Sequence, residues 1–195
     1  MPKHLPESVY DFIKQIHSLS AVERRIILAS GRSENVAEHS WHLAMMAWLL
    51  APYYERKLDS EKILKLALMH DLVEIIAGDT FAFGDRIGQK EREDEAAEQL
   101  FAQLPRQQRE EFSKLWEEYK EDKTKEARFV RALDKLQPGI TNILYRGRGW
   151  KQFKVSKDMA KVHKKFIESR GPMLKEAVAR VWNQAIQEKL FWEES

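Results

Sequence analysis

The chain has 195 residues, a length that fits one compact domain with a substantial core. It contains no cysteine, which excludes disulfides, thiolate metal sites and cysteine nucleophiles. Its formal charge of +2 hides an acidic stretch over 89–122, with 11 acids against 6 bases, and a basic stretch over 123–170, with 14 bases against 4 acids. The basic stretch is compatible with a phosphate-bearing partner and equally with a solvated helical surface.

The first 20 residues are amphipathic and lack the continuous apolar segment of a signal peptide. The longest apolar run covers residues 43–54 and falls short of the roughly 20 residues that span a bilayer. We therefore expect a soluble, cytoplasmic protein with no membrane partner.

Nearly every segment between the scarce glycines and prolines has helical period. We expect helices over residues 7–19, 36–54, 60–78, 89–104, 107–121, 124–145, 156–169 and 172–190. No strand-like alternation of useful length stands out, so residues 22–28 are interpreted as a short apolar turn followed by a loop. The fold class is all-α: a single compact helical bundle over 1–195, with a core over about 8–150 and C-terminal helices over 156–190 packing on it.

Local signals set several of these boundaries. Asn35 is expected to cap the second helix, with Glu38 completing a capping-box pattern, and Ser60 is expected to cap the third. The helix over 124–145 is expected to kink or break near Pro138. Residues 146–150, "RGRGW", are expected to form a flexible basic connector.

The stretch "LKLALMHDLVEIIAGDT" (64–80) sets a histidine and three carboxylates in a segment that otherwise looks like a buried helix. Unpaired buried charges cost several kcal/mol, so something positive is expected among them. A divalent cation bound by His70 and Asp71 removes the difficulty. It also leaves Glu74, one helical turn after His70, to accept a proton from a water molecule activated by that ion.

One helix offers only about two ligands to a single ion, so the others must come from elsewhere. His39 and His42 lie on another predicted helix, and Asp134 interrupts an apolar helical face. Taken alone, Asp134 is better explained by a structural ion pair with Arg131 or Lys135. Two imidazoles and two carboxylates form a mixed nitrogen and oxygen set, which suits one first-row divalent metal with open positions.

Three blocks carry a family resemblance: "VAEHSWHLAMMAWLLAP", "LALMHDLVEIIAGDTFA" and "ARFVRALDKLQPGI". They resemble the signature blocks of HD-domain phosphohydrolases, and more narrowly the 5′-nucleotidase branch that acts on deoxyribonucleoside monophosphates. The resemblance covers residues 8–190 and is least distinctive over about the last 40. It implies a homodimer, a catalytic carboxylate at Glu74, one divalent ion (Mn²⁺, Co²⁺, Mg²⁺, Zn²⁺ or Fe²⁺), and metal ligands His39, His70, Asp71 and Asp134.

The resemblance also implies substrate contacts. Asp79 falls where the branch contacts the sugar hydroxyl, and Arg25 or Arg24 falls where it holds the phosphate. Better-studied members follow that arginine with a tryptophan that crowds a ribose 2′-hydroxyl, whereas this chain reads "RRII". Lys135 is expected to help Arg25 to stabilise charge on the phosphoryl oxygens.

Other residues receive more ordinary interpretations. Glu38 is expected either to accept an imidazole N–H of the site or to serve as helix N-terminal charge. His42 is expected to line the pocket or pack in the core, and His163 to lie on a solvated basic helix. Core positions are expected for Trp41, Trp48, Trp116 and Trp182.

The sequence favours a metal-dependent phosphomonoesterase acting on (deoxy)ribonucleoside 5′-monophosphates. One alternative keeps the scaffold but hydrolyses a nucleoside triphosphate or guanosine tetraphosphate. Two others are a non-catalytic module that binds nucleic acid through its basic stretch and a helical protein whose metal only stabilises the fold. The enzyme ranks first, and no nucleic-acid partner is expected, because the non-catalytic alternatives leave Glu74 and Asp79 unexplained.

Overall fold

The computed structural model describes residues 4–194, and in that part of the chain it contains ten α-helices, two short 3-10 helices and one two-stranded sheet. The expected all-α class is confirmed, with the small sheet as an addition. The α-helices are α1 Glu7–Ile16, α2 Val36–Leu50, α3 Ser60–Met69, α4 Glu74–Ala77, α5 Gln89–Phe101, α6 Arg106–Glu121, α7 Lys125–Leu144, α8 Arg148–Gln152, α9 Lys157–Glu168 and α10 Pro172–Gln187. The remaining elements are η1 His17–Ala21, η2 Ala51–Tyr53, β1 Glu23–Ile27 and β2 Ser33–Asn35.

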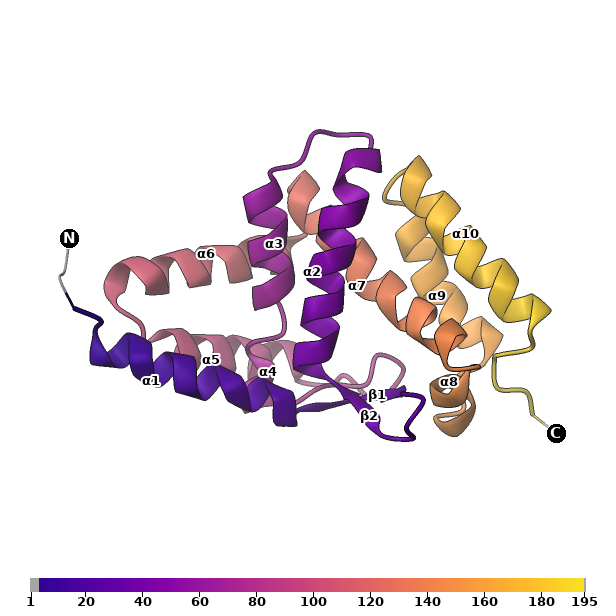
Figure 1. Ribbon diagram of the computed structural model, residues 1–195, viewed down its shortest axis with the longest axis horizontal. Helices are drawn as coiled ribbons and strands as arrows, with labels where there is room; N and C mark the ends of the chain where they lie inside the picture. The colour runs from indigo at the N-terminus through magenta and orange to yellow at the C-terminus, as the bar shows by residue number, and fades with distance from the viewer. Residues whose placement is uncertain (1–3, 195) are drawn as a thin grey trace.

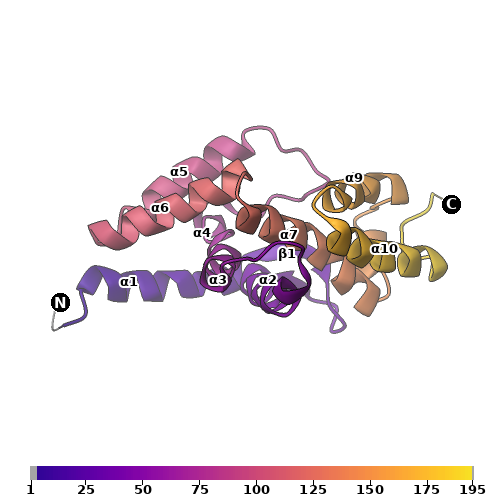
Figure 2. The same cartoon turned by 90° about the horizontal axis from the view of Figure 1, so that it is seen from above.

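Helices α2, α3 and α7 pack against one another in the middle of the molecule. In Figure 1, α1, α5 and α6 lie on one side of these three helices, and α9 and α10 lie on the other. Seen from above in Figure 2, α7 runs from the α5–α6 pair toward the α9–α10 pair. Because α7 contacts α6 at one end and α9 and α10 further along, a residue at the middle of α7 lies between the two groups of helices.

The core lies where the central helices meet. Leu43 of α2, Leu66 of α3 and Leu133 of α7 are fully buried, and burying such a side chain contributes about 1.5–3 kcal/mol. The predicted capping box is confirmed: the Asn35 side chain accepts from the Glu38 backbone N–H at 2.9 Å, and the Glu38 carboxylate accepts from the Asn35 N–H at 3.0 Å. This box fixes the residue at which α2 begins.

A β-hairpin occupies the segment for which the sequence predicted a turn and a loop, so that prediction is wrong. β1 pairs antiparallel with β2, with Glu23 opposite Asn35 and Ile27 opposite Ser33. The strands are too short, and β1 too rich in arginine, for a period of two to stand out from the sequence. Successive side chains of a strand point to opposite faces, which gives consecutive residues of β1 different surroundings.

The predicted helix over 60–78 is interrupted. Asp59, not Ser60, is its N-cap and accepts from the Lys62 backbone N–H at 3.1 Å. α3 ends at Met69, and the Glu74 N–H then bonds to the Asp71 carbonyl at 3.0 Å, a contact three residues back instead of four. The chain therefore tightens between α3 and α4, and His70 and Glu74 are not one turn apart on a regular helix.

Two expectations for the C-terminal half are corrected. α7 is not broken at Pro138 but continues to Leu144, and it packs against α2, α3, α9 and α10. Residues 146–150 are not a flexible connector: part of the segment forms α8, and Trp150 is buried and stacks on Phe191 with ring centroids 4.5 Å apart.

The tryptophans divide between core and surface. Trp116 is buried, as predicted, and Trp182 is half-buried. Trp41 and Trp48 are 65% and 62% exposed, so their assignment to the core is wrong. Neither helical period nor composition separates an outward-facing tryptophan from a core one when α2 is apolar on most sides. None of the described helices is both long enough and apolar enough to cross a membrane.

Candidate metal centre and its pocket

Four side chains from three helical segments converge on one point. His39 comes from α2, His70 and Asp71 from the tightened turn after α3, and Asp134 from the middle of α7. The His39 Nε2 atom lies 3.3 Å from His70 Nε2, 3.6 Å from Asp71 Oδ2 and 3.3 Å from Asp134 Oδ1. His70 Nε2 lies 3.0 Å from Asp71 Oδ2 and 3.8 Å from Asp134 Oδ1. The ligand atoms of His39, His70 and Asp71 all lie within 4.8 Å of one another, as around a single small cation, and Asp134 Oδ1 approaches both imidazoles from α7.

The second nitrogen of each imidazole is held by a hydrogen-bond acceptor. His39 Nδ1 donates to Gln137 Oε1 at 3.1 Å, and His70 Nδ1 donates to the Ala67 carbonyl at 2.9 Å. Both Nε2 atoms are therefore free to present lone pairs, and both are buried. Two lone pairs facing each other at this distance repel unless a proton or a metal ion lies between them, which is the usual arrangement around a bound metal.

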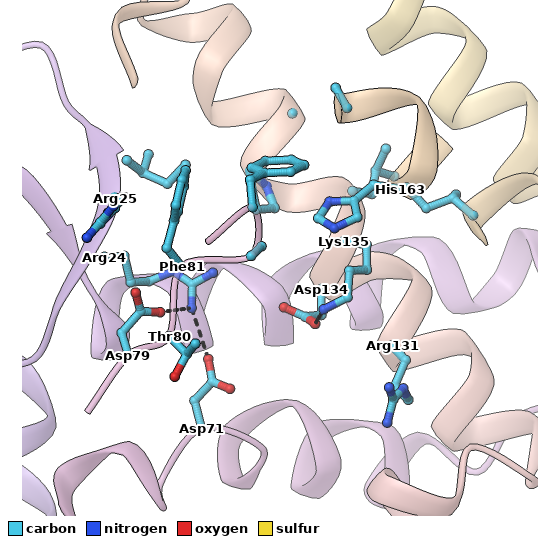
Figure 3. Close-up of a pocket in the computed structure, with 18 of the residues that line it drawn as sticks. Arg24, Arg25, Asp71, Asp79, Thr80, Phe81, Arg131, Asp134, Lys135 and His163 are labelled. Carbon is cyan, nitrogen blue, oxygen red and sulfur yellow. Dashed lines mark hydrogen bonds and ion pairs between the residues drawn. The ribbon is translucent and has the colours of Figure 1, made fainter. Parts of the chain in front are cut away.

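Each carboxylate also has a defined orientation. Asp134 turns Oδ1 toward the imidazoles, while its Oδ2 accepts from Tyr119 Oη at 3.1 Å and from Lys135 Nζ at 2.8 Å. Lys135, not Arg131, is thus the ion-pair partner of Asp134; Arg131 instead donates to the Tyr119 backbone carbonyl at 2.9 Å. Figure 3 shows Asp134 and Lys135 together, with Arg131 to one side.

The electrostatics of the cluster call for a cation. Burial, together with the nearby Arg24, lowers the pKa of His39 to about 4, so this imidazole is neutral at pH 7. Burial alone would raise the pKa of Asp71, but His70 and Arg24 outweigh it and hold the pKa at about 2. Lys135 likewise keeps the pKa of Asp134 well below its usual value against the effect of burial. Two ionised carboxylates with imidazole nitrogens between them fit one divalent ion.

Arg24 lies against the ligand set. Its Nη1 atom is 3.1 Å from Asp71 Oδ2 and 3.6 Å from Asp79 Oδ1, as the dashed lines of Figure 3 indicate, and its Nε is 3.5 Å from Glu34 Oε2. Arg25 has other surroundings, since its guanidinium lies over the Phe81 ring at 4.8 Å. Both arginines line the same cavity, but Arg24 is the one beside the metal ligands.

Glu74 is the carboxylate of the site without a partner. It is buried, and its Oε2 atom accepts no hydrogen bond from any described residue. Burial and the neighbouring Asp71 raise the pKa of Glu74 well above its usual value. An orphaned carboxylate oxygen lining the cavity is suited to exchange a proton with a molecule bound there.

Asp79 is brought to the site by a sharp change of chain direction. α4 ends at Ala77, and the following Gly78 has a φ of 73° and a ψ of 157°, a region that only glycine occupies readily. The loop over 78–88 then carries Asp79, Thr80 and Phe81 along one wall of the cavity, which has a volume of about 220 Å³.

The other wall includes His163, which was predicted from the sequence to lie on a solvated helix. His163 of α9 is not solvated but lines the cavity, and its ring stacks on Phe83 with centroids 4.8 Å apart and an interplanar angle of 28°. The basic residues around it in "KVHKKF" concealed this, because the pattern does not tell which face of α9 meets the rest of the molecule.

The residues that orient the His39 ring by hydrogen bonding were not predicted from the sequence. Gln137 is fully buried, and its Nε2 donates to Glu34 Oε1 at 2.9 Å and to His42 Nδ1 at 3.1 Å. Glu38, which was considered for this role, instead caps α2 and pairs with Arg32. His42 contacts Gln137 and lies outside the ligand set. One signal was present: Gln137 follows Asp134 by three residues and so shares its face of α7.

The sequence resembles those of known proteins. Residues 16–175 match the model of the HD domain family. The human 5′-deoxynucleotidase HDDC2 is 34% identical over 139 residues, covering 69% of this chain and 66% of the relative. The 5′-deoxynucleotidase YfbR of Escherichia coli (strain ATCC 8739) is 31% identical over 118 residues, covering 55% of this chain and 59% of the relative. The chain thus matches just under two thirds of the length of these curated relatives.

Solved structures resemble this one over more of its length. A predicted metal-dependent phosphohydrolase from Magnetospirillum magnetotacticum MS-1 superposes with a TM-score of 0.88 at 36% identity, covering 96% of this chain and 95% of that one. A conserved hypothetical protein from Pyrococcus furiosus gives 0.61 at 27% identity, covering 89% and 99%. The resemblance drawn from the three sequence blocks is confirmed, although the family model covers less than the expected 8–190.

Proposed function

Because this chain belongs to the HD domain family, we propose that it is a metal-dependent phosphomonoesterase acting on (deoxy)ribonucleoside 5′-monophosphates. The observation that carries this proposal is the convergence of two imidazoles and two carboxylates beside Arg24 and the unpaired Glu74. The curated names of the similar 5′-deoxynucleotidases support the choice of substrate class.

The ion would be held by His39, His70, Asp71 and Asp134. When bound, it supplies Lewis acidity, which lowers the pKa of a neighbouring water molecule and offsets negative charge on the phosphate. Glu74 would accept one proton of the attacking water. A bond from the water oxygen to phosphorus then forms as the bond between phosphorus and the 5′-oxygen breaks, and the 5′-oxygen leaves with a proton taken from solvent. The raised pKa of Glu74 suits this task, because a general base works best when its pKa lies near the working pH.

Arg24 and Lys135 bind the phosphate oxygens. Both cations lie within ion-pair distance of a proposed metal ligand, at 3.1 Å from Asp71 and 2.8 Å from Asp134, so both would be close to a phosphate bound beside the ligand set. Charge-assisted hydrogen bonds of this kind strengthen as charge develops on the phosphoryl oxygens. The guanidinium of Arg25 stacks on the Phe81 ring, so Arg25 does not replace Arg24 at the phosphate. It forms part of the cavity wall beyond the phosphate. Asp79 contacts a sugar hydroxyl.

The test is phosphate release from a panel of ribo- and deoxyribonucleoside 5′-monophosphates. The protein is stripped of metal and then resupplied with Mn²⁺, Co²⁺, Mg²⁺, Zn²⁺ or Fe²⁺ in turn. Release should depend on the ion and fall by at least about 100-fold in Glu74→Ala. Glu93→Ala is the matched control, because Glu93 is a partly buried carboxylate of the same cavity that already accepts from Gln89 at 2.5 Å.

The same panel separates the alternatives. Release from nucleoside triphosphates or guanosine tetraphosphate, with none from monophosphates, would replace the proposed substrate class and keep the hydrolytic site. No release with any ion, together with salt-sensitive binding of RNA that survives His70→Ala, would replace the enzyme by a nucleic-acid-binding module.

We also propose a cytoplasmic homodimer. The exposed apolar side chains of α2 and η2 support an interface there, since Trp41, Trp48, Leu49 and Tyr53 are each more than 60% exposed. Large apolar patches on a surface commonly mark such contacts. Light scattering should give a dimer mass for the natural chain and a monomer mass for the double variant Trp41→Glu, Trp48→Glu; a dimer mass for both would place the interface elsewhere.

A further inference from the structure

The cavity extends beyond the metal ligands toward the C-terminal helices. At that end three partly exposed rings line it: Phe81 and Phe83 from the loop over 78–88, and His163 of α9. A fourth ring, Phe153 just after α8, packs against Phe81. Figure 3 shows His163 near Lys135, across from Phe81 and Arg25. We call these four residues the aromatic end of the cavity.

The rings of the aromatic end touch one another in a continuous series. His163 stacks on Phe83 at 4.8 Å, Phe83 meets Phe81 edge-on at 5.6 Å, and Phe81 lies 5.8 Å from Phe153. The Arg25 guanidinium covers the Phe81 face at 4.8 Å. Flat groups in this arrangement form a platform for a flat ligand, because an aromatic ligand gains by stacking on rings and guanidinium planes.

His163 adds polarity to this platform. Burial and the nearby Lys135 lower its pKa to about 4, so the ring is neutral at pH 7 and carries one donor and one acceptor nitrogen. Neither nitrogen is hydrogen-bonded to a described residue. A heteroaromatic base presents both donors and acceptors on its edges, so a neutral imidazole matches it in chemistry as well as in shape.

The opposite end of the cavity, toward α5 and α6, is less suited to such a ligand. Its rings are Trp116 and Tyr119, which are buried. Their polar atoms are already used: Trp116 Nε1 donates to Asp94 at 3.3 Å and Tyr119 Oη donates to Asp134 at 3.1 Å. A flat ligand would find no exposed ring face there among the described residues.

We propose that the base of the substrate binds at the aromatic end, against the Phe83–His163 pair, with His163 as a direct contact that favours nucleotides over sugar phosphates lacking a base. This inference rests on the function proposed above. The order of residues along the loop agrees with it: Asp79 lies beside Arg24 at the phosphate, and Phe81 and Phe83 follow toward α9. The nucleotide then lies along the loop from phosphate to base.

The test compares two substrates, 2′-deoxyadenosine 5′-monophosphate and 2-deoxyribose 5-phosphate, which has no base. His163→Ala should lower kcat/KM for the nucleotide about tenfold, mainly through KM, because one stacking contact is lost. It should leave kcat/KM for the sugar phosphate unchanged. His163→Phe should recover part of the loss, since it restores stacking without the hydrogen bonds. Val162→Ala is the control, because Val162 is the preceding residue of α9 and is 67% exposed.

Equal losses for both substrates in His163→Ala, or no loss for either, would overturn the inference while leaving the proposed function in place. If the natural protein hydrolyses neither substrate with any ion, the proposed function fails. The inference is then decided by calorimetric binding of 2′-deoxyadenosine to the natural protein and to His163→Ala. Weaker binding by the variant supports the base contact, and equal binding or none overturns it.

Discussion

The hydrogen bond from His39 to Gln137 leads to a quantitative prediction. Gln137→Met keeps the length and shape of the side chain but removes the acceptor at 3.1 Å from His39 Nδ1 and the donor at 2.9 Å from Glu34 Oε1. His39 is then free to rotate or to place its proton on Nε2, the nitrogen that faces the ion. Loss of such a supporting bond typically lowers metal affinity 10- to 100-fold, which corresponds to about 1.4–2.8 kcal/mol.

Metal affinity is measured by competition between the protein and a chromophoric chelator for Co²⁺ or Zn²⁺, so no assumption about the substrate enters. Thr141→Val is the matched control. Thr141 is buried one turn further along α7, and its hydroxyl donates to the Gln137 backbone carbonyl at 3.2 Å without touching the ligand set. An affinity for Gln137→Met within twofold of the natural protein, with the fold intact by circular dichroism, would refute the idea that Gln137 positions His39.

Three further predictions concern stability. Gly147→Ala should lower the free energy of unfolding, measured by urea denaturation, by about 3 kcal/mol. The φ of Gly147 is +68°, and an added Cβ would lie 2.2 Å from the Leu190 carbonyl oxygen. Gly31→Ala is the control: its φ is +88° but its added Cβ would have nothing within 4 Å, so the free energy of unfolding should fall by only about 1 kcal/mol. The pKa of His163 is lowered from 6.5 to about 4 in the folded protein, so the unfolded chain binds more protons between these pH values, and the metal-free protein loses stability as the pH falls from 6.5 toward 4. His163→Gln should reduce this loss of stability by about 2 kcal/mol, a figure discounted for the partial exposure of the ring. An unchanged dependence of stability on pH would contradict this prediction. A chelator should lower the midpoint of thermal unfolding of the natural protein by several degrees, since an ion at 100 times its Kd stabilises the native state by about 2.7 kcal/mol. The chelator should lower the midpoint of Asp134→Asn by less. Equal changes of the midpoint in the two proteins would exclude Asp134 as a ligand.

The helices could be predicted from their apolar period, and the proposed ligands stand out for a separate reason. Buried carboxylates and imidazoles in apolar helices are costly unless they are paired, so His70, Asp71 and Asp134 stand out from their neighbours. The capping box at Asn35 could be predicted because it depends only on residues three apart. These signals are local in the chain, or they concern the cost of burial at a single residue.

The missed features depend on contacts between distant segments. Gln137 is an unremarkable residue until α2 brings His39 to it across 98 positions of sequence. His163 looks like a surface residue until α9 packs on α7 and the loop over 78–88 brings Phe83 beneath its ring. The β-hairpin is too short to show its period, yet it decides that Arg24 lies beside Asp71. No pattern within one helix contains this information.

This difference suggests how the two halves of the cavity can change independently. The metal end is fixed by a buried network in which moving any one of His39, Gln137 or Asp134 leaves polar groups of the others unpaired, at about 1–3 kcal/mol each. The aromatic end consists of partly exposed side chains on a loop and on α9, whose replacement leaves few buried groups without partners. Substitutions there can alter which base is accepted while the ion and its chemistry stay the same. The identity of the residues at 83 and 163 should therefore indicate the substrate preference of a related chain, and the ligand set should not.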